Sequence, residues 1–208
     1  MAALTLYHMT PSRSSIALWM LEEVGEPFEI HQLRRGETRE SAYLAVNPMG
    51  KVPALRHGNA LVTEVAAICC YLADAFPAAG LNVPLGDPLR GDYLKWLFFA
   101  PGVFEPAVAD RAFKRVEPPP RSAIGYGDFD TVMDVVARAV SAAPYLVGGR
   151  FTAADLLIGA NLRWAMAFGL IPKREEFARY VAQLDARPAY QRAAARDAEI
   201  AAQSRAGA

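Results

Sequence analysis

The sequence predicts an α/β domain followed by an all-helical domain. Short runs of alternating apolar and polar residues lie in the first 76 residues, where they are interleaved with helical patterns. The following residues, up to 88, are rich in Pro, Gly and Ala and have no periodicity, which is typical of a connection between domains. Beyond residue 88, apolar residues recur at helical spacing. We therefore expect an α/β domain at 1–77, a linker at 78–88 and a helical domain at 89–208.

The first domain is expected to begin with a strand, a helix and a second strand, which makes the two strands parallel. Thr10 and Pro11 fit the N-cap and first position of the first helix, and Gly25 fits its end. A hairpin and a last helix complete the domain. The expected elements are strands at 4–7, 28–32, 52–56 and 60–63, helices at 11–24 and 64–75, and a short irregular helix at 36–46.

The second domain is expected to contain helices at 89–116, 128–142, 152–168, 174–184 and 189–202. Pro101, Gly102 and Pro106 predict a kink or break in the first of them. The segment Glu117–Pro120 carries three prolines and predicts a stiff connection. Thr152 and Asp155 have the spacing of a capping box, and Phe151 and Leu156 that of a hydrophobic staple, so this motif is expected to be structural.

Composition excludes several classes of function. Hydrophobic residues make up 53% and charged residues 21%, and 22 basic residues balance 22 acidic ones, which argues against disorder and nucleic-acid binding. Without an apolar run of 18 residues or a basic leader, we expect a cytosolic protein without a membrane segment. The histidines are scattered and glycine-rich phosphate motifs are missing, so neither a metal site nor a nucleotide cofactor is expected.

Two segments carry the functional signal, NPMGKVPAL at 47–55 and TEVAAICCYLAD at 63–74. Together they resemble the glutathione-binding signature of the glutathione transferase superfamily. The resemblance implies a thioredoxin-like first domain, a helical-bundle second domain and a cytosolic, bacterial-type member. It also implies a cis bond between Val52 and Pro53, with the Val52 backbone facing the cysteinyl unit of glutathione.

The same resemblance assigns the two ends of glutathione. Glu64 and Val65 stand where the family holds the γ-glutamyl group, and the free N–H groups of a helix start suit its carboxylate. The family usually has Ser at the position of Val65, so a contact of about 0.5–1.5 kcal/mol is lost. Lys51 matches the position near the glycyl carboxylate, with Arg13 and Arg34 as alternatives. Each of these residues also has a simple structural interpretation, such as a solvated loop cation or a charge complementing a helix dipole.

The residue that activates the thiol is sought in YHMTPSRSS at 7–15, because the family uses a Tyr, Ser or Cys there. No Cys lies in this segment, which argues against a cysteine-type member or a dithiol oxidoreductase. Ser12 is the first candidate and implies a serine-type member. Thr10, which also fits a helix cap, and Ser14 are the alternatives. Tyr7 is expected in the strand, as a core residue.

The resemblance implies that the glutathione thiolate attacks a small apolar electrophile bound between the domains, in a protein that is usually a homodimer. Glutathione is then a cosubstrate, and no other cofactor is expected. Glutathione-dependent isomerisation, peroxide reduction and dehalogenation are alternatives, as is a non-catalytic protein that binds glutathione or another ligand. The candidate walls of the second-substrate pocket are Met9, Phe98, Phe99, Phe104, Trp164 and Phe168, most of which could equally be core residues.

Overall fold

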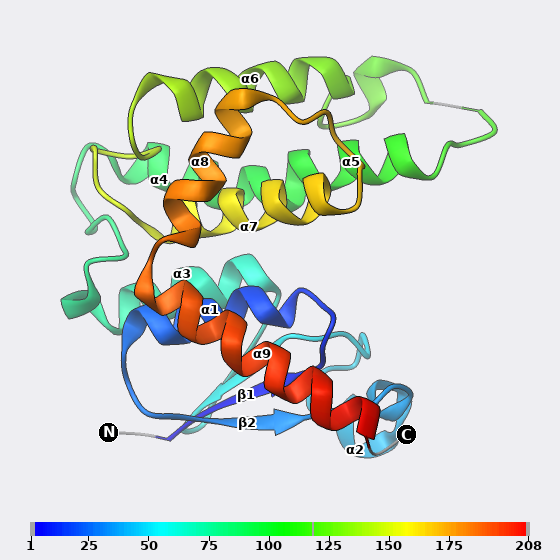
Figure 1. Ribbon diagram of the computed structural model, residues 1–208, viewed down its shortest axis with the longest axis vertical. Coiled ribbons are helices and arrows are strands. Elements are labelled where there is room, and N and C mark those ends of the chain that lie inside the picture. The colour runs from blue at the N-terminus through cyan, green and yellow to red at the C-terminus, as the bar shows by residue number, and fades with distance from the viewer. Residues whose placement is uncertain (1–2, 118, 207–208) are drawn as a thin grey trace. The chain divides into compact units, whose positions relative to one another are not determined.

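The computed structural model describes residues 3–117 and 119–206, and the chain forms two compact units (Figure 1). One unit combines the described residues up to Leu81 with those from Ala186 onward, and the other is Asn82–Asp185. The second unit begins at Asn82, within the segment 78–88 that is expected as a linker. Its end differs from the expected domain at 89–208, because the last helix packs with the first unit.

The first unit contains a four-stranded sheet in the order β2-β1-β3-β4. Strand β1 (Leu4–His8) pairs in parallel with β2 (Phe28–Gln32), as the crossover predicts. Strand β3 (Ala54–His57) runs antiparallel to both β1 and β4 (Ala60–Thr63). Leu4, Leu6, Ala54 and Leu55 are buried, and they place the core of this unit on the sheet.

Helices complete the first unit, and α1 (Ser14–Val24) contacts both α3 (Val65–Ala75) and α9 (Pro188–Ala206). Between β2 and β3 lie the 3₁₀ turn η1 (Glu37–Arg39) and the short helix α2 (Ser41–Leu44), within the irregular segment that the sequence predicts. A further 3₁₀ turn, η2, spans Pro77–Ala79.

The start of α1 differs from the prediction. Neither Thr10 nor Pro11 is its N-cap or first residue, because the helix begins at Ser14 and its N-cap is Arg13. The peptide bond between Thr10 and Pro11 is cis, and hydrogen bonds of the Ser14 hydroxyl to the Met9 backbone hold a turn here instead. Gly25 ends the helix in the left-handed conformation, as predicted, and donates to the carbonyl of Leu21.

Helix α9 lies alongside α1 (Figure 1). Two acidic residues at the end of α1 bind arginines of α9: Glu23 pairs with Arg187, and Glu22 pairs with Arg192 and Arg196. Both carboxylates are largely buried, with exposed fractions of 6% and 10%. Partly buried charge pairs are worth more than exposed ones, so these contacts hold α9 on the first unit.

The second unit is helical, as predicted, and is built around α7 (Ala153–Ala167), whose first ten residues are all buried. The expected helix at 89–116 is α4 (Arg90–Phe99), the π-helical segment η3 (Ala100–Phe104) and α5 (Glu105–Ala112). Pro101 therefore produces a π-helical segment rather than a break. Two expected helices are present with nearly the predicted bounds, α6 (Phe129–Ala142) and α8 (Glu175–Asp185). The 3₁₀ turn η4 (Arg121–Ala123) lies in a segment where no helix was expected. Pro118, part of the predicted stiff connection, lies outside the described residues.

The predicted capping box at the start of α7 is present, with reciprocal contacts between Thr152 and Asp155. No helix in the part of the chain that the structure describes is long and apolar enough to cross a membrane. Among the same residues, no group of three or more acidic, His or Cys side chains could hold a metal ion.

Candidate functional site

The register of the sheet brings the predicted site segments to one end of it. Tyr7 pairs with Ala54, and Ala54 pairs with Thr63. The chain therefore leaves β1 toward Met9, enters β3 from Val52 and leaves β4 toward Glu64, all at the same end. Adjacent strands lie about 4.8 Å apart, so these three positions extend over about 10 Å.

A buried pair of side chains shapes the loop before β3. Tyr43 donates from its hydroxyl to the Lys51 carbonyl at 2.6 Å, and the Asn47 amide nitrogen donates to the same oxygen at 2.8 Å. Burial raises the pKa of Tyr43 to about 12, so its hydroxyl keeps its proton and stays a donor. The Lys51 carbonyl is thus turned inward, and the Val52–Pro53 bond that follows is cis. Lys51 itself is exposed, Val52 is half-buried and Pro53 is buried.

Gly50 brings this loop close to the turn η1. Its φ of +61° favours glycine, and a Cβ atom there would lie 2.7 Å from the backbone carbonyl oxygen of Thr38. The same position lies within van der Waals reach of the Arg39 side chain. Arg39 is therefore a cation beside Gly50, the residue before Lys51. No local sequence pattern predicts this, because only the folded loop brings residues 39 and 50 together. Arg13 and Arg34, the other basic candidates, are exposed.

Glu64 has a strained backbone at the start of α3. Its φ of 67° is the only positive value outside glycine among the described residues, and its ψ is 120°. Such a conformation costs on the order of 1–3 kcal/mol and is typical of binding sites. Glu64 is exposed and serves as the N-cap, while Val65, the first helical residue, is buried. The Glu64 side chain is thus free of the core, and the first N–H groups of α3 lie next to it.

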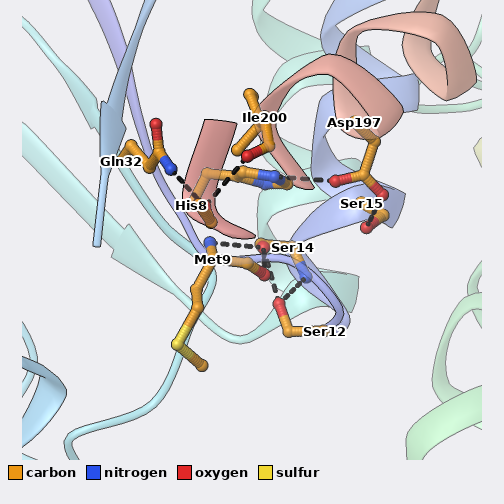
Figure 2. A network of polar contacts seen from close by, with 9 residues as sticks. His8, Met9, Ser12, Ser14, Ser15, Gln32, Asp197 and Ile200 are labelled. Atoms are coloured by element: carbon orange, nitrogen blue, oxygen red, sulfur yellow. Dashed lines mark hydrogen bonds and ion pairs between the residues drawn. The ribbon is translucent and has the colours of Figure 1, made fainter. Parts of the chain in front are cut away.

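The three hydroxyl candidates differ in their surroundings (Figure 2). Ser14 is fully buried: it accepts a hydrogen bond from the Met9 amide at 3.1 Å and donates to the Met9 carbonyl at 3.0 Å. Ser12 is partly exposed, accepts from the Ser14 amide at 3.0 Å and lies 2.6 Å from the Ser14 hydroxyl oxygen. Ser12 therefore sits in a turn held by Ser14, rather than in the first turn of α1 as expected. Of these two, Ser12 is the hydroxyl that a ligand can reach.

The third hydroxyl, that of Thr10, lies near the Asp197 carboxylate of α9 and helps to lower the pKa of that carboxyl. Asp197 accepts from His8 Nε2 at 2.9 Å and from the Ser15 hydroxyl at 2.6 Å. Burial opposes the ionisation of Asp197, but these hydrogen bonds outweigh it and hold the pKa of the carboxyl below its usual value. No local pattern in the sequence predicts that His8 and Asp197 are partners, since they are 189 positions apart in the chain.

The apolar candidates fall into different environments. Phe104 is part of the core of the second unit, with 1% of its surface exposed, so it is not available as a pocket wall there. Trp164 and Phe168 contact each other with ring centroids 5.0 Å apart, and both are largely exposed. The remaining candidates are Met9 and Phe99, which are half-buried, and Phe98, which is exposed.

Comparison with known proteins agrees with this geometry. The family model described as the glutathione S-transferase N-terminal domain matches residues 12–75. Glutathione S-transferase F11 of Arabidopsis thaliana is 30% identical over 194 residues, which cover 85% of this chain and 89% of the relative. Glutathione S-transferase GstA of Escherichia coli O157:H7 is 29% identical over 180 residues, or 82% of this chain and 87% of the relative.

Solved structures give the same result for the whole fold. A glutathione transferase of Methylococcus capsulatus superposes with a TM-score of 0.77 at 29% identity and covers 94% of this chain and 99% of its own. BphK, a bacterial glutathione transferase solved as a ternary complex, superposes with a TM-score of 0.79 at 26% identity, covering 93% and 99%. Sequence, sheet topology and relatives along most of the chain thus agree, and the protein belongs to the glutathione transferase superfamily.

Proposed function

We propose that this protein binds glutathione across the end of the sheet and transfers it to small apolar electrophiles, with Ser12 activating the thiol. The observation that carries the proposal is that the end of β1, which leads to Ser12, the start of β3 after Val52 and the end of β4 before Glu64 lie at the same end of the sheet. Adjacent strands lie about 4.8 Å apart, so Val52 before β3 and Glu64 after β4 are close enough for one tripeptide to reach both.

The two ends of the site differ in charge, as the two ends of glutathione do. At the α3 end, helix N–H groups favour the γ-glutamyl carboxylate, and the exposed Glu64 suits its ammonium group. At the other end, Lys51 and Arg39 supply positive charge for the glycyl carboxylate. Between them, the Val52 backbone lies next to the cis bond and faces the cysteinyl unit in our proposal.

The activation requires a modest free energy. Lowering the pKa of a thiol from about 9 to about 7 takes about 2.7 kcal/mol, at 1.36 kcal/mol for each unit. One hydrogen bond to a charged group contributes about 1.5–3 kcal/mol. Ser12 already accepts a hydrogen bond from the Ser14 amide, which polarises its O–H and strengthens it as a donor to sulfur. A single hydroxyl at Ser12 is therefore sufficient for most of the activation.

A non-catalytic glutathione-binding protein is the second candidate, and one contact favours it. The Ser12 and Ser14 hydroxyl oxygens are 2.6 Å apart, so one hydroxyl donates to the other. If Ser12 is the donor, its proton is not available to the glutathione sulfur. For Ser12 to activate the thiol, Ser14 must donate to Ser12 and leave the Met9 carbonyl.

The pKa of bound glutathione tests the proposal and separates the two candidates. Ultraviolet titration of the complex should show a thiolate near neutral pH, and Ser12→Ala should raise the pKa of the bound thiol by about 1–2 while leaving glutathione affinity nearly unchanged. The exposed Ser122→Ala serves as the matched control. A thiol that stays protonated in the wild-type complex would support the non-catalytic candidate, and no calorimetric signal with glutathione would refute both.

The reaction type and the assembly are further parts of the proposal. Assays with glutathione and a panel of electrophiles, peroxides, haloalkanes and maleyl compounds distinguish conjugation from peroxide reduction, dehalogenation and isomerisation. The family supports a homodimer and a cytoplasmic location for this chain. Light scattering and cell fractionation test them.

A further inference from the structure

The turn that carries Ser12 lies within residues 8–15, which we call the activating turn. One carboxylate of the last helix binds this turn. Asp197 of α9 accepts from His8, which precedes Met9, and from Ser15, which follows Ser14 (Figure 2). Asp197 therefore contacts both ends of the segment 8–15.

These contacts connect directly to the atoms that hold Ser12. Met9 and Ser14 exchange two hydrogen bonds across the turn, and Ser14 binds the Ser12 hydroxyl oxygen through its own amide and hydroxyl. His8 and Ser15, the two residues bound by Asp197, are the immediate neighbours of Met9 and Ser14. A displacement of the carboxylate would move both neighbours, and with them the direction in which Ser12 donates.

The arrangement of Ser15, Asp197 and His8 excludes a second nucleophilic site. In a catalytic triad the imidazole stands between the hydroxyl and the carboxylate. Here the carboxylate stands between them, so the Ser15 hydroxyl donates to Asp197 and not to the imidazole of His8. The other ring nitrogen of His8, Nδ1, is buried without a hydrogen-bond partner in the described part of the chain. The geometry suits holding the turn rather than chemistry of its own.

We propose that Asp197 is a positioning residue for the activating turn, through which α9 determines how well Ser12 donates to the glutathione sulfur. This inference rests on the proposed role of Ser12. It gives the last helix a specific function beyond packing, because the carboxylate is bound by residues at both ends of the turn. Nothing else in α9 reaches these residues in the hydrogen bonds described.

The structure offers a matched control on the same helix. Arg192 attaches α9 to the end of α1, where it donates to the Glu22 carboxylate at 2.8 Å and to the Glu22 carbonyl at 3.0 Å. It has no contact with the activating turn among these bonds. Arg192→Ala therefore weakens the attachment of α9 at one place and leaves the Asp197 contacts intact, whereas Asp197→Ala does the opposite.

The experiment compares Asp197→Ala with Arg192→Ala. It measures the pKa of the thiol of bound glutathione, kcat, KM for glutathione and the midpoint of urea unfolding. We expect Asp197→Ala to raise the pKa of the bound thiol by about 1 and to lower kcat about tenfold, with KM nearly unchanged. Arg192→Ala should lower the unfolding midpoint without moving the pKa of the thiol. An unchanged pKa in folded Asp197→Ala, or an equal change in Arg192→Ala, would overturn the proposal.

Two further measurements keep the outcomes distinguishable. Should Asp197→Ala fail to fold, Ser15→Ala removes one of the two hydrogen bonds to Asp197 and should raise the pKa of the thiol by a smaller amount; no change there would also count against the proposal. Hydrogen exchange at the Met9 and Ser14 amides needs no ligand, and Asp197→Ala should accelerate it at least tenfold while Arg192→Ala does not. If wild-type protein forms no thiolate, the role of Ser12 fails, but this exchange still decides whether Asp197 orders the turn.

Discussion

Replacing Asp155 by alanine should be among the most destabilising single changes in this protein. The carboxylate is fully buried at the start of α7 and accepts four hydrogen bonds. The Leu146 amide and the Tyr180 hydroxyl bind one oxygen at 2.7 and 2.6 Å. The Thr152 amide and hydroxyl bind the other at 2.8 and 2.9 Å. One side chain thus joins the loop before α7, the start of α7 itself and α8.

The magnitude follows from which donors lose their partner. Each buried donor left without an acceptor costs about 1–3 kcal/mol. The Thr152 and Tyr180 hydroxyls can rotate, but the two backbone amides cannot, so they set a cost of about 2–6 kcal/mol. Burial raises the pKa of Asp155 despite these bonds, which means that its ionised form carries a desolvation cost that the variant no longer has. We expect a net loss of about 3–5 kcal/mol, as is typical for breaking a buried charged contact.

Urea unfolding at neutral pH, followed by far-ultraviolet circular dichroism, measures this loss. Asp130→Ala is the control, because Asp130 is also an acidic residue in the first turn of a helix, α6, but is exposed. The free energy of unfolding of Asp130→Ala should stay within about 0.5 kcal/mol of the wild-type value. A loss below about 1 kcal/mol for Asp155→Ala would refute the reasoning, since it would mean that the two amides find other acceptors.

Two more predictions concern packing and pH. In α7, Gly159→Ala should lower stability by about 1–3 kcal/mol in the same urea assay, because the new Cβ would lie 2.1 Å from the Cδ1 atom of the fully buried Leu184; an unchanged midpoint would show that Leu184 can move aside. The attachment of α9 should weaken in acid. Burial opposes the ionisation of Glu22 and Asp197, yet their hydrogen bonds keep both pKa values below the usual 4.5 and 3.8. Their contribution to stability is therefore present above those values and lost as the pH falls through the lower folded-state pKa. In the wild-type protein, the free energy of unfolding should decrease as the pH falls from about 6 to about 3. In the double variant Glu22→Gln, Asp197→Asn this decrease with pH should be smaller. An equal decrease in both proteins would contradict the conclusion that these two carboxylates cause it.

The sequence predicts some features of the candidate site, but it does not predict the surroundings of each residue. The resemblance to the superfamily indicates the segments at 47–55 and 63–74, and the register of the sheet brings the two segments to one end of it. The same resemblance indicates Ser12, but it does not predict the turn in which Ser12 lies. The sequence predicts Thr10 as a helix cap, whereas in the structure the helix begins at Ser14, whose hydroxyl closes the preceding turn by binding the Met9 backbone.

What the sequence alone determined is the order of elements, the parallel first pair of strands, the hairpin and the capping box at Thr152. These follow from periodicity, turn residues and capping, which act over a few residues. What only the tertiary structure decided is the place of α9, the proximity of Arg39 to Gly50 and the burial of Phe104. A charged helix such as α9 shows in its sequence that it carries arginines and an aspartate, but not which partners they meet. The contacts to Glu22, Glu23 and His8 cross more than 160 residues, and only the folded chain brings such partners together.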